Sequence, residues 1–320
     1  MKYTSVTTSE SSKFSRTRRP PANLASAEWN EVVMMLFENE MAETLSLLRE
    51  CDRDFLESLW VLFKPYADAN FQREFERSHN LQSRFWEMYL GVALLKLGLA
   101  IIPRNKRIDE RGPDICITDL GSRVWVEAIA PKPGAGPDHV EDIVADGHAQ
   151  SVPDREITLR YCHGIYDKFE KLKGYRDLGI IQANEPCVIA LSGGGVPDVW
   201  KEAMIPRVLQ ALFAIGQYEA TVNPRSMRIE SEGFALRDAI CKQKGSHVRT
   251  DIFLDRTFAL VSGVLFSYAD VYNRPRTLGA DFIFVHNSQA SCPLPRGWLK
   301  IGHEYWVEDG KLRRRVWNVG

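Results

Sequence analysis

Three acidic residues lie in segments that are otherwise apolar, and their chemistry suggests a metal site. Asp114 opens the run PDICIT, Glu127 ends the run RVWVE, and Glu87 lies among aromatic residues in RFWEMYL. Burying an isolated carboxylate is costly unless it gains a partner. Carboxylate oxygens suit Mg²⁺ or Mn²⁺, which can activate a bound water as a nucleophile. The pattern therefore predicts a divalent-metal site for hydrolysis.

The two acids in strand-like runs meet if these runs form a hairpin. Counting outward from a two-residue connection at 120–121, Cys116 faces Trp125 and Asp114 faces Glu127. Directly opposed side chains have Cβ atoms about 5 Å apart, so the two carboxylates repel unless a cation lies between them. A register shift of one residue would remove this opposition. The alternative is that both acids are solvated strand ends.

Glu87 is expected on the inward face of a helix over residues 82–98. Leu90, Gly91 and Leu94 follow it at i+3, i+4 and i+7, which places them on the same helical face. Gly91 leaves room for another element to approach this face closely. The alternative is an ordinary exposed glutamate on the helix surface.

Apolar periodicity predicts the elements that carry these acids, in the order helix, three strands, helix, strand. They are expected near residues 82–98, 99–102, 113–118, 123–130, 154–175 and 186–195. A disordered basic arm is expected over residues 1–27, a helical section over 28–80, the core over 81–195, and helices and strands completing the same domain over 196–320. In this last section we expect helices to about residue 242, then strands near 257–268, 280–286 and 304–316.

The acids and the element order together resemble the PD-(D/E)xK, or restriction-endonuclease-like, nuclease superfamily. The shared features are the helical Glu87, the dipeptide Pro113-Asp114 opening a strand, Glu127 late in the next strand, and the αβββαβ order across residues 82–192. The resemblance implies an α/β fold with a restriction-endonuclease-like αβββαβ core, a helical N-terminal addition and a mixed α/β C-terminal addition. It also implies Mg²⁺ or Mn²⁺ bound by Asp114 and Glu127, with Glu87 assisting catalysis.

The chain departs from this superfamily at the lysine that should follow the glutamate by two residues. Ile129 stands there, and an apolar side chain cannot orient water or neutralise phosphate. Lys132 lies beyond Pro131 and is expected in a loop.

The helix over 154–175 offers a substitute for the missing lysine. Arg160, Lys168 and Lys171 share one helical face. Lys168 is the predicted catalytic substitute, and Arg160 and Lys171 are predicted to contact substrate phosphate. The alternative is a solvated basic stripe that pairs with acids of the same helix.

The composition of the chain argues against a membrane-spanning protein and against zinc or disulfide frameworks. The 320 residues include 44% hydrophobic residues, enough for a substantial core, and their formal net charge is −1. No apolar run is long enough to span a bilayer, and the six scattered cysteines show no zinc or disulfide pattern. We expect a cytoplasmic protein with no membrane partner. The basic stretches near the two ends could contact phosphate, although solvated disordered tails are the commoner interpretation.

Two functions remain open on the sequence alone. The first is a Mg²⁺- or Mn²⁺-dependent nuclease that hydrolyses DNA or RNA. The second is a noncatalytic nucleic-acid-binding or scaffolding protein that keeps a degenerate nuclease fold, and Ile129 favours it. Nucleic acid is the expected partner in both, and homo-oligomer formation is open.

Overall fold

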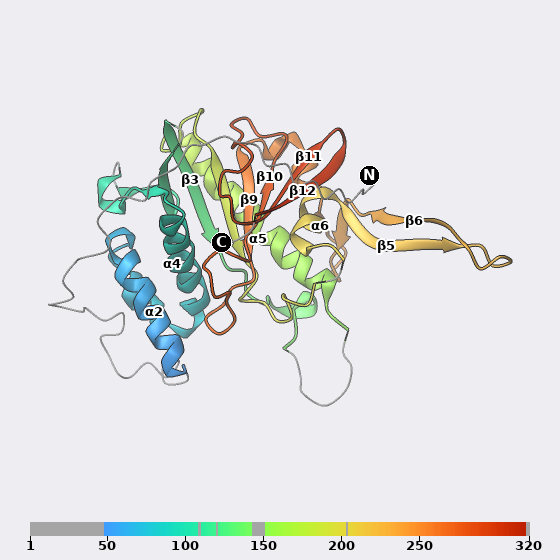
Figure 1. Cartoon of the computed structure of the whole chain (residues 1–320), viewed down its shortest axis with the longest axis horizontal. Coiled ribbons are helices and arrows are strands. Elements are labelled where there is room, and N and C mark those ends of the chain that lie inside the picture. Colours follow the sequence, from blue (N-terminus) through green and yellow to red (C-terminus); the bar gives the residue numbers. More distant parts are fainter. Residues whose placement is uncertain (1–47, 108–109, 120, 143–150, 203, 318–320) are drawn as a thin grey trace.

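An eight-stranded mixed sheet forms the centre of the protein, in the order β1-β2-β3-β4-β9-β10-β11-β12. The computed structural model describes residues 48–107, 110–119, 121–142, 151–202 and 204–317 (Figure 1). The strands of the sheet are β1 (Ala100–Ile101), β2 (Ile115–Asp119), β3 (Ser122–Ile129), β4 (Cys187–Ser192), β9 (Val261–Ser267), β10 (Ile283–His286), β11 (Gly302–Glu308) and β12 (Lys311–Trp317). Strand β3 is antiparallel to β2 and parallel to β4.

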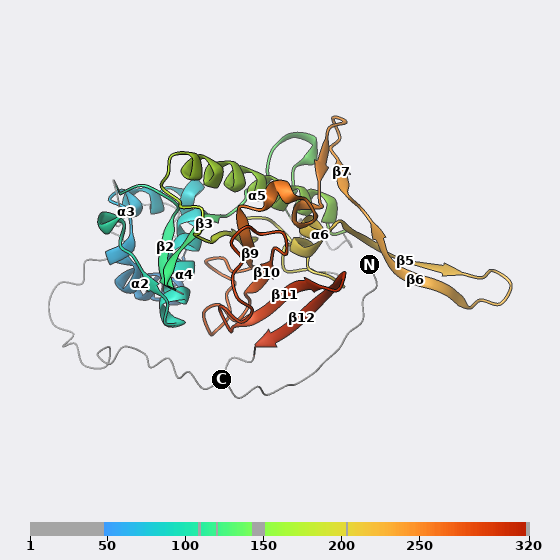
Figure 2. The same cartoon turned by 90° about the horizontal axis from the view of Figure 1, so that it is seen from above.

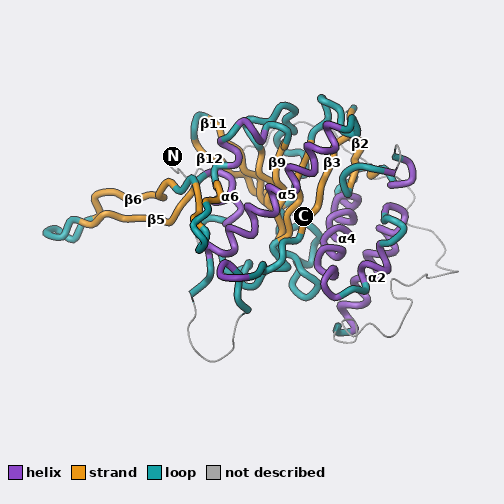
Figure 3. The backbone as a smooth tube through the Cα atoms, turned by 180° about the vertical axis from the view of Figure 1, so that it is seen from behind, coloured by secondary structure: helices purple, strands orange, loops and turns teal. Residues whose placement is uncertain are grey.

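Helices cover both faces of the sheet because the strands alternate two sets of buried side chains. The helices are α2 (Glu50–Phe63), α3 (Phe71–Phe75), α4 (Leu81–Lys96), α5 (Asp154–Asp177) and α6 (Arg207–Phe213). Val124 and Val126 of β3 belong to the apolar cluster that includes α4, whereas Trp125 belongs to the cluster that includes α5. Figure 2 shows β2 and β3 between α4 and α5, and Figure 3 shows the same helices from behind.

The predicted element order from residue 82 to residue 195 is confirmed. The structure contains α4, β1, β2, β3, α5 and β4 in that sequence, each overlapping its expected range. The inward face of α4 is also confirmed, because Glu87 is buried and a Cβ atom added to Gly91 would lie 2.4 Å from the ring of Phe63. Trp86 on the same helix donates a hydrogen bond to the carbonyl of Ala190 in β4, at 2.9 Å.

The prediction of helices from residue 196 to about residue 242 is wrong except for α6. That segment forms strands β5 (Ile215–Val222), β6 (Ile229–Leu236) and β7 (Ala239–Cys241), and β7 pairs with β8 (His247–Arg249). Helix α6 ends at Phe213 and is capped by Ala214, whose φ of 56° is left-handed. Asn223 then starts a turn, since its Oδ1 accepts hydrogen bonds from the backbone of Arg225 and Ser226. The short apolar runs beside these breaks pair as strands.

The C-terminal strands agree with the expected ranges in part. The segment expected as one strand over 304–316 is a hairpin of β11 and β12, connected at Asp309 and Gly310. The basic run at 311–315 therefore lies in an ordered strand and is not a disordered tail. The predicted arm over 1–27 and the part of the expected helical section before residue 48 lie outside the described residues, whereas α2 and α3 confirm helices in the remainder of that section. Among the described helices, none is long and apolar enough to cross a membrane.

Candidate active site

The predicted hairpin register is confirmed, and it places Asp114 beside the end of β3. Cys116 pairs with Trp125, and the ladder begins where Ile115 pairs with Val126. Asp114 is the next residue outward, opposite Glu127. Its Oδ2 accepts a hydrogen bond from the backbone of Ala128 at 2.8 Å, which fixes the carboxylate against β3.

Glu127 is the most buried of the three acids, and its two oxygens have different surroundings. Its side chain is fully buried, and Oε1 accepts hydrogen bonds from Lys168 Nζ at 2.7 Å and from Lys171 Nζ at 2.6 Å. Oε2 is also buried and has no hydrogen-bond partner among the described residues. Burial and the charge of Asp114 raise the pKa of Glu127, although both lysines oppose this shift. Glu127 therefore has one paired oxygen and one buried oxygen without a partner among the described residues, and its carboxyl group feels the charge of Asp114.

The two lysines come from α5, so the helix predicted to supply a substitute lysine does reach the strand acids. Lys168 is mostly buried, with 17% of its side chain exposed, while Lys171 is 44% exposed. Burial lowers the pKa of Lys171, but the carboxylates of Glu127 and Asp114 raise it by more, so the amine stays charged. The predicted alternative, in which both lysines are solvated and pair with acids of α5, does not fit these contacts.

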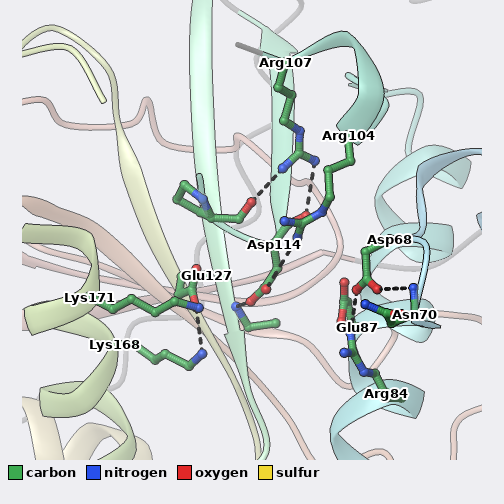
Figure 4. A network of polar contacts seen from close by, with 12 residues as sticks. Asp68, Asn70, Arg84, Glu87, Arg104, Arg107, Asp114, Glu127, Lys168 and Lys171 are labelled. Atoms are coloured by element: carbon green, nitrogen blue, oxygen red, sulfur yellow. Dashed lines mark hydrogen bonds and ion pairs between the residues drawn. The ribbon is translucent and has the colours of Figure 1, made fainter. Parts of the chain in front are cut away.

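Glu87 reaches the same region from α4, on the other side of the sheet. Its carboxylate accepts a hydrogen bond from Arg84 at 2.9 Å, and Arg84 also pairs with Asp68 at 3.0 Å. Burial and the charge of Asp114 raise the pKa of Glu87 to about 8. Figure 4 shows Asp114 between Glu127 and Glu87. Asp114 thus acts electrostatically on both of the other acids.

Two arginines that lie at the site were not predicted from the sequence. Arg104 Nη2 lies 3.9 Å from Asp114 Oδ1, and Arg107 donates hydrogen bonds to the carbonyls of Pro113 at 2.7 Å and Asp114 at 3.2 Å (Figure 4). Burial and the nearby Arg104 lower the pKa of Arg107 to about 10. The basic run RNKRIDER, which ends shortly before Asp114, could have indicated that arginines lie near this acid.

The remaining predicted residues lie beside the three acids rather than among them. Arg160 packs against the loop after β3, where its guanidinium would contact a Cβ atom added to Gly134. Ile129, at the position of the expected lysine, packs against α5 at Gly164. Lys132 is exposed in the loop, as predicted. Of the three basic residues singled out on α5, Lys168 and Lys171 therefore contact the acidic centre, and Arg160 contacts the adjoining loop.

The arrangement fits a metal held by few protein ligands. Among the described residues, no group of three or more His, Cys, Asp or Glu side chains forms a ready-made metal site. Asp114 and the free Oε2 of Glu127 could supply two oxygen ligands, and Mg²⁺ commonly binds through one or two carboxylates while keeping several waters. Comparisons of the chain with protein-family models, with characterised proteins and with solved structures found no match.

Proposed function

We propose that this protein is a metal-dependent nuclease that hydrolyses phosphodiester bonds of DNA or RNA on a PD-(D/E)xK-like core. The observation that carries the proposal is the division of the Glu127 carboxylate. Two lysines bind Oε1, while Oε2 is buried and has no hydrogen-bond partner among the described residues, and the charge of Asp114 acts on the same carboxyl group. A buried oxygen without a hydrogen-bond partner lowers the stability of the folded protein. A purely structural role for Glu127 would therefore not explain the unpaired oxygen. A cation shared with Asp114 would remove that cost.

Mg²⁺ or Mn²⁺ would be held by Asp114 and by Oε2 of Glu127. When bound, such an ion polarises a phosphoryl oxygen and lowers the pKa of a bound water. The hydrogen bond from Ala128 orients Asp114, and the two α5 lysines hold the Glu127 side chain in place. These contacts preorganise both carboxylates before the ion arrives, which reduces the entropy lost on binding.

The cations around the acids have roles that fit phosphodiester hydrolysis. Lys168 is buried enough for its charge to act strongly on a phosphate whose negative charge increases in the transition state. Arg104, close to Asp114, is positioned to bind a substrate phosphate near the acids. Glu87, with its raised pKa, adds a carboxyl group that can hold a proton near neutral pH.

A second candidate is the noncatalytic nucleic-acid-binding protein, and Ile129 favours it. The side chain at this position packs against α5 and cannot take part in chemistry. In this alternative, Lys168 and Lys171 only neutralise the buried Glu127 and have a structural role. Such a protein would bind nucleic acid with a strong dependence on salt, because its contacts would be mainly to phosphate.

Cleavage of labelled single- and double-stranded DNA and RNA by the purified full chain separates the two candidates. We expect cleavage with Mg²⁺ or Mn²⁺ that stops on chelation and that Asp114→Asn abolishes. Asp167→Asn, on α5, is the matched control and should cleave normally. Binding of the same substrates without cleavage by the unmutated protein, with every metal tested, would contradict the proposal and favour the noncatalytic protein.

A further inference from the structure

A small pocket lies along β3 from the acidic centre, on the same face of the sheet as Glu127. It has a volume of about 180 Å³ and is lined by Arg111, Arg123, Trp125, Gln182 and residues 178–180. Alternate residues of a strand share a face, so Arg123 and Trp125 point to the same side of β3 as Glu127. Four residues of strand place Arg123 about 13 Å from Glu127 along the chain.

Two guanidinium groups of this pocket keep hydrogen-bond donors that the fold does not use. Arg111 is exposed and has no hydrogen bond or ion pair with another described residue. Arg123 donates from Nε to Glu185 at 2.6 Å, and its guanidinium carbon lies 5.2 Å from the centroid of the Trp125 ring. Its side chain is 31% exposed, and its two Nη atoms have no hydrogen-bond partner among the described residues.

The nearest acid, Glu185, holds the pocket wall in place and does not line the pocket. Glu185 is buried and accepts hydrogen bonds from Arg123, from Trp125 Nε1 at 2.8 Å and from the backbone of Gln182 at 2.8 Å. None of the residues that line the pocket is acidic. A positive pocket with fixed guanidinium donors is suited to phosphate, which arginine binds through two parallel hydrogen bonds.

Helix α5 connects this pocket with the acidic centre. Lys171 donates to Glu127, and its amine lies 5.7 Å from the centroid of the Tyr175 ring, one helical turn further along. Residues 178–180, which follow the end of α5, line the pocket. The C-terminal half of α5 therefore runs from the acids to the pocket.

The chain between β1 and β2 makes the same connection from the other side. It carries Arg104, which lies 3.9 Å from Asp114, and Arg111, which lines the pocket. Gly112 brings Arg111 to the pocket, because a Cβ atom added to this glycine would lie 2.9 Å from the ring of Trp125. Cations therefore lie at both ends of one path, with Arg104 at the acidic centre (Figure 4) and Arg111 at the pocket.

We propose that the pocket between Arg111 and Arg123 binds a phosphate group of the nucleic-acid substrate, a few nucleotides from the bond that is cleaved. The proposal rests on the proposed function for the identity of the substrate. This second contact fixes the strand so that the phosphate to be cleaved lies at Asp114 and Glu127. Because the contact is the same in the ground state and in the transition state, it contributes to affinity and not to the rate of the bound complex.

Binding measured in a chelator tests the pocket separately from cleavage. The first variant is Arg111→Ala, which removes an exposed side chain without a partner among the described residues. The second is Arg123→Lys, which keeps a positive charge beside Glu185 but removes both Nη atoms. Arg276→Ala is the matched control, because Arg276 is exposed in the loop after β9 and has no described partner either. Circular dichroism of each variant reports whether the fold is intact.

Fluorescence anisotropy with short labelled strands and duplexes of DNA and RNA measures the affinity. We expect Arg111→Ala and Arg123→Lys each to weaken binding about tenfold, as loss of a charge-assisted hydrogen bond predicts. The slope of log affinity against log salt should become shallower by about 0.7 to 0.9, the value for one phosphate contact. A neutral methylphosphonate placed at one position of the strand should weaken binding to the unmutated protein but not to Arg111→Ala. Arg276→Ala should bind as the unmutated protein does.

Equal affinities and salt slopes for Arg111→Ala and Arg276→Ala would overturn the proposal, as would an unmutated protein that binds none of these nucleic acids. Strands with and without a terminal phosphate show which phosphate is bound. A terminal phosphate that strengthens binding only when Arg111 is present is itself the ligand, and otherwise the ligand is an internal phosphate. Metal-dependent cleavage by a protein whose Arg111→Ala variant binds normally would refute the pocket but not the nuclease.

Discussion

At the scale of single residues, the candidate site is defined by three carboxylates, and the charge of Asp114 acts on the other two. Asp114 raises the pKa of Glu87 and of Glu127, after the larger effect of burial in each case. Arg84 beside Glu87, and Lys168 and Lys171 beside Glu127, offset only part of these increases in pKa. Carboxyl groups with raised pKa values in one site are typical of catalytic centres.

The raised pKa of Glu87 predicts a pH dependence of stability. Between about pH 4.5 and pH 8 the folded protein keeps a proton on Glu87 that the unfolded chain releases. The folded state therefore binds more protons, and the free energy of unfolding decreases as pH rises through this window. With a chelator present to remove metal, Glu87→Gln should make this slope shallower. The total decrease in the free energy of unfolding across the window should be smaller than in the unmutated protein by an amount on the order of a few kcal/mol. Urea unfolding at several pH values measures the slope.

The control for this experiment is Glu170→Gln, which changes an exposed glutamate of α5. It should leave the slope unchanged. Equal slopes for Glu87→Gln and the unmutated protein would mean that Glu87 titrates normally in the folded state.

At the scale of elements, α4 and α5 bring groups to the site from opposite faces of the sheet. Glu87 comes from α4 and Lys168 from α5, and the hairpin of β2 and β3 lies between them. In the proposed nuclease, Lys168 would take the role of the lysine that Ile129 does not supply, because its Nζ contacts Glu127 from α5. Because α5 packs on β3 near Gly164, its next turn places Lys168 close to Glu127.

The placement of Lys168 predicts a selective effect on catalysis. Lys168→Ala should lower the single-turnover cleavage rate by about a hundredfold or more, because its charge acts mainly on the transition state. Nucleic-acid affinity should change by only a few-fold, since one phosphate contact at most is lost. Quench-flow cleavage at saturating protein measures the rate, and fluorescence anisotropy measures the affinity.

Lys173→Ala is the matched control for Lys168, because Lys173 is an exposed lysine of the same helix that pairs with Glu170. Lys171 cannot serve as the control, because it also donates to Glu127. A cleavage rate for Lys168→Ala equal to that of the Lys173→Ala control would remove Lys168 from the catalytic site.

Much of this arrangement was predictable from local sequence. Counting from the turn at residue 121 gave the pairing of Cys116 with Trp125, because the period of two along a strand leaves little freedom once the turn is known. The inward face of α4 followed from helical spacing around Glu87. The contact of Arg104 with Asp114 was not predictable, since it depends on how the loop between β1 and β2 folds back.

At the scale of the whole molecule, the sheet continues well beyond the predicted core. Strands β9 to β12 extend it past β4, and the arm of β5 and β6 projects from the body, with Ile215 at its base buried in the core. Sequence periodicity failed over residues 215–241, because short segments of mixed polar and apolar residues such as β5 fit a helix and a strand equally well. The segment forms a strand and not a helix because β5 pairs with β6.

The measurement that tests the central claim most directly is Mn²⁺ binding to the full chain, followed by calorimetry or by electron paramagnetic resonance. The account predicts a specific Mn²⁺ site in the unmutated protein that Asp114→Asn and Glu127→Gln each weaken by tenfold or more, a change of about 1.4 kcal/mol or more in binding free energy. Asp167→Asn should bind Mn²⁺ as the unmutated protein does. An absence of specific Mn²⁺ binding, or binding that both site variants retain in full, would contradict the assignment of Asp114 and Glu127 as a metal centre.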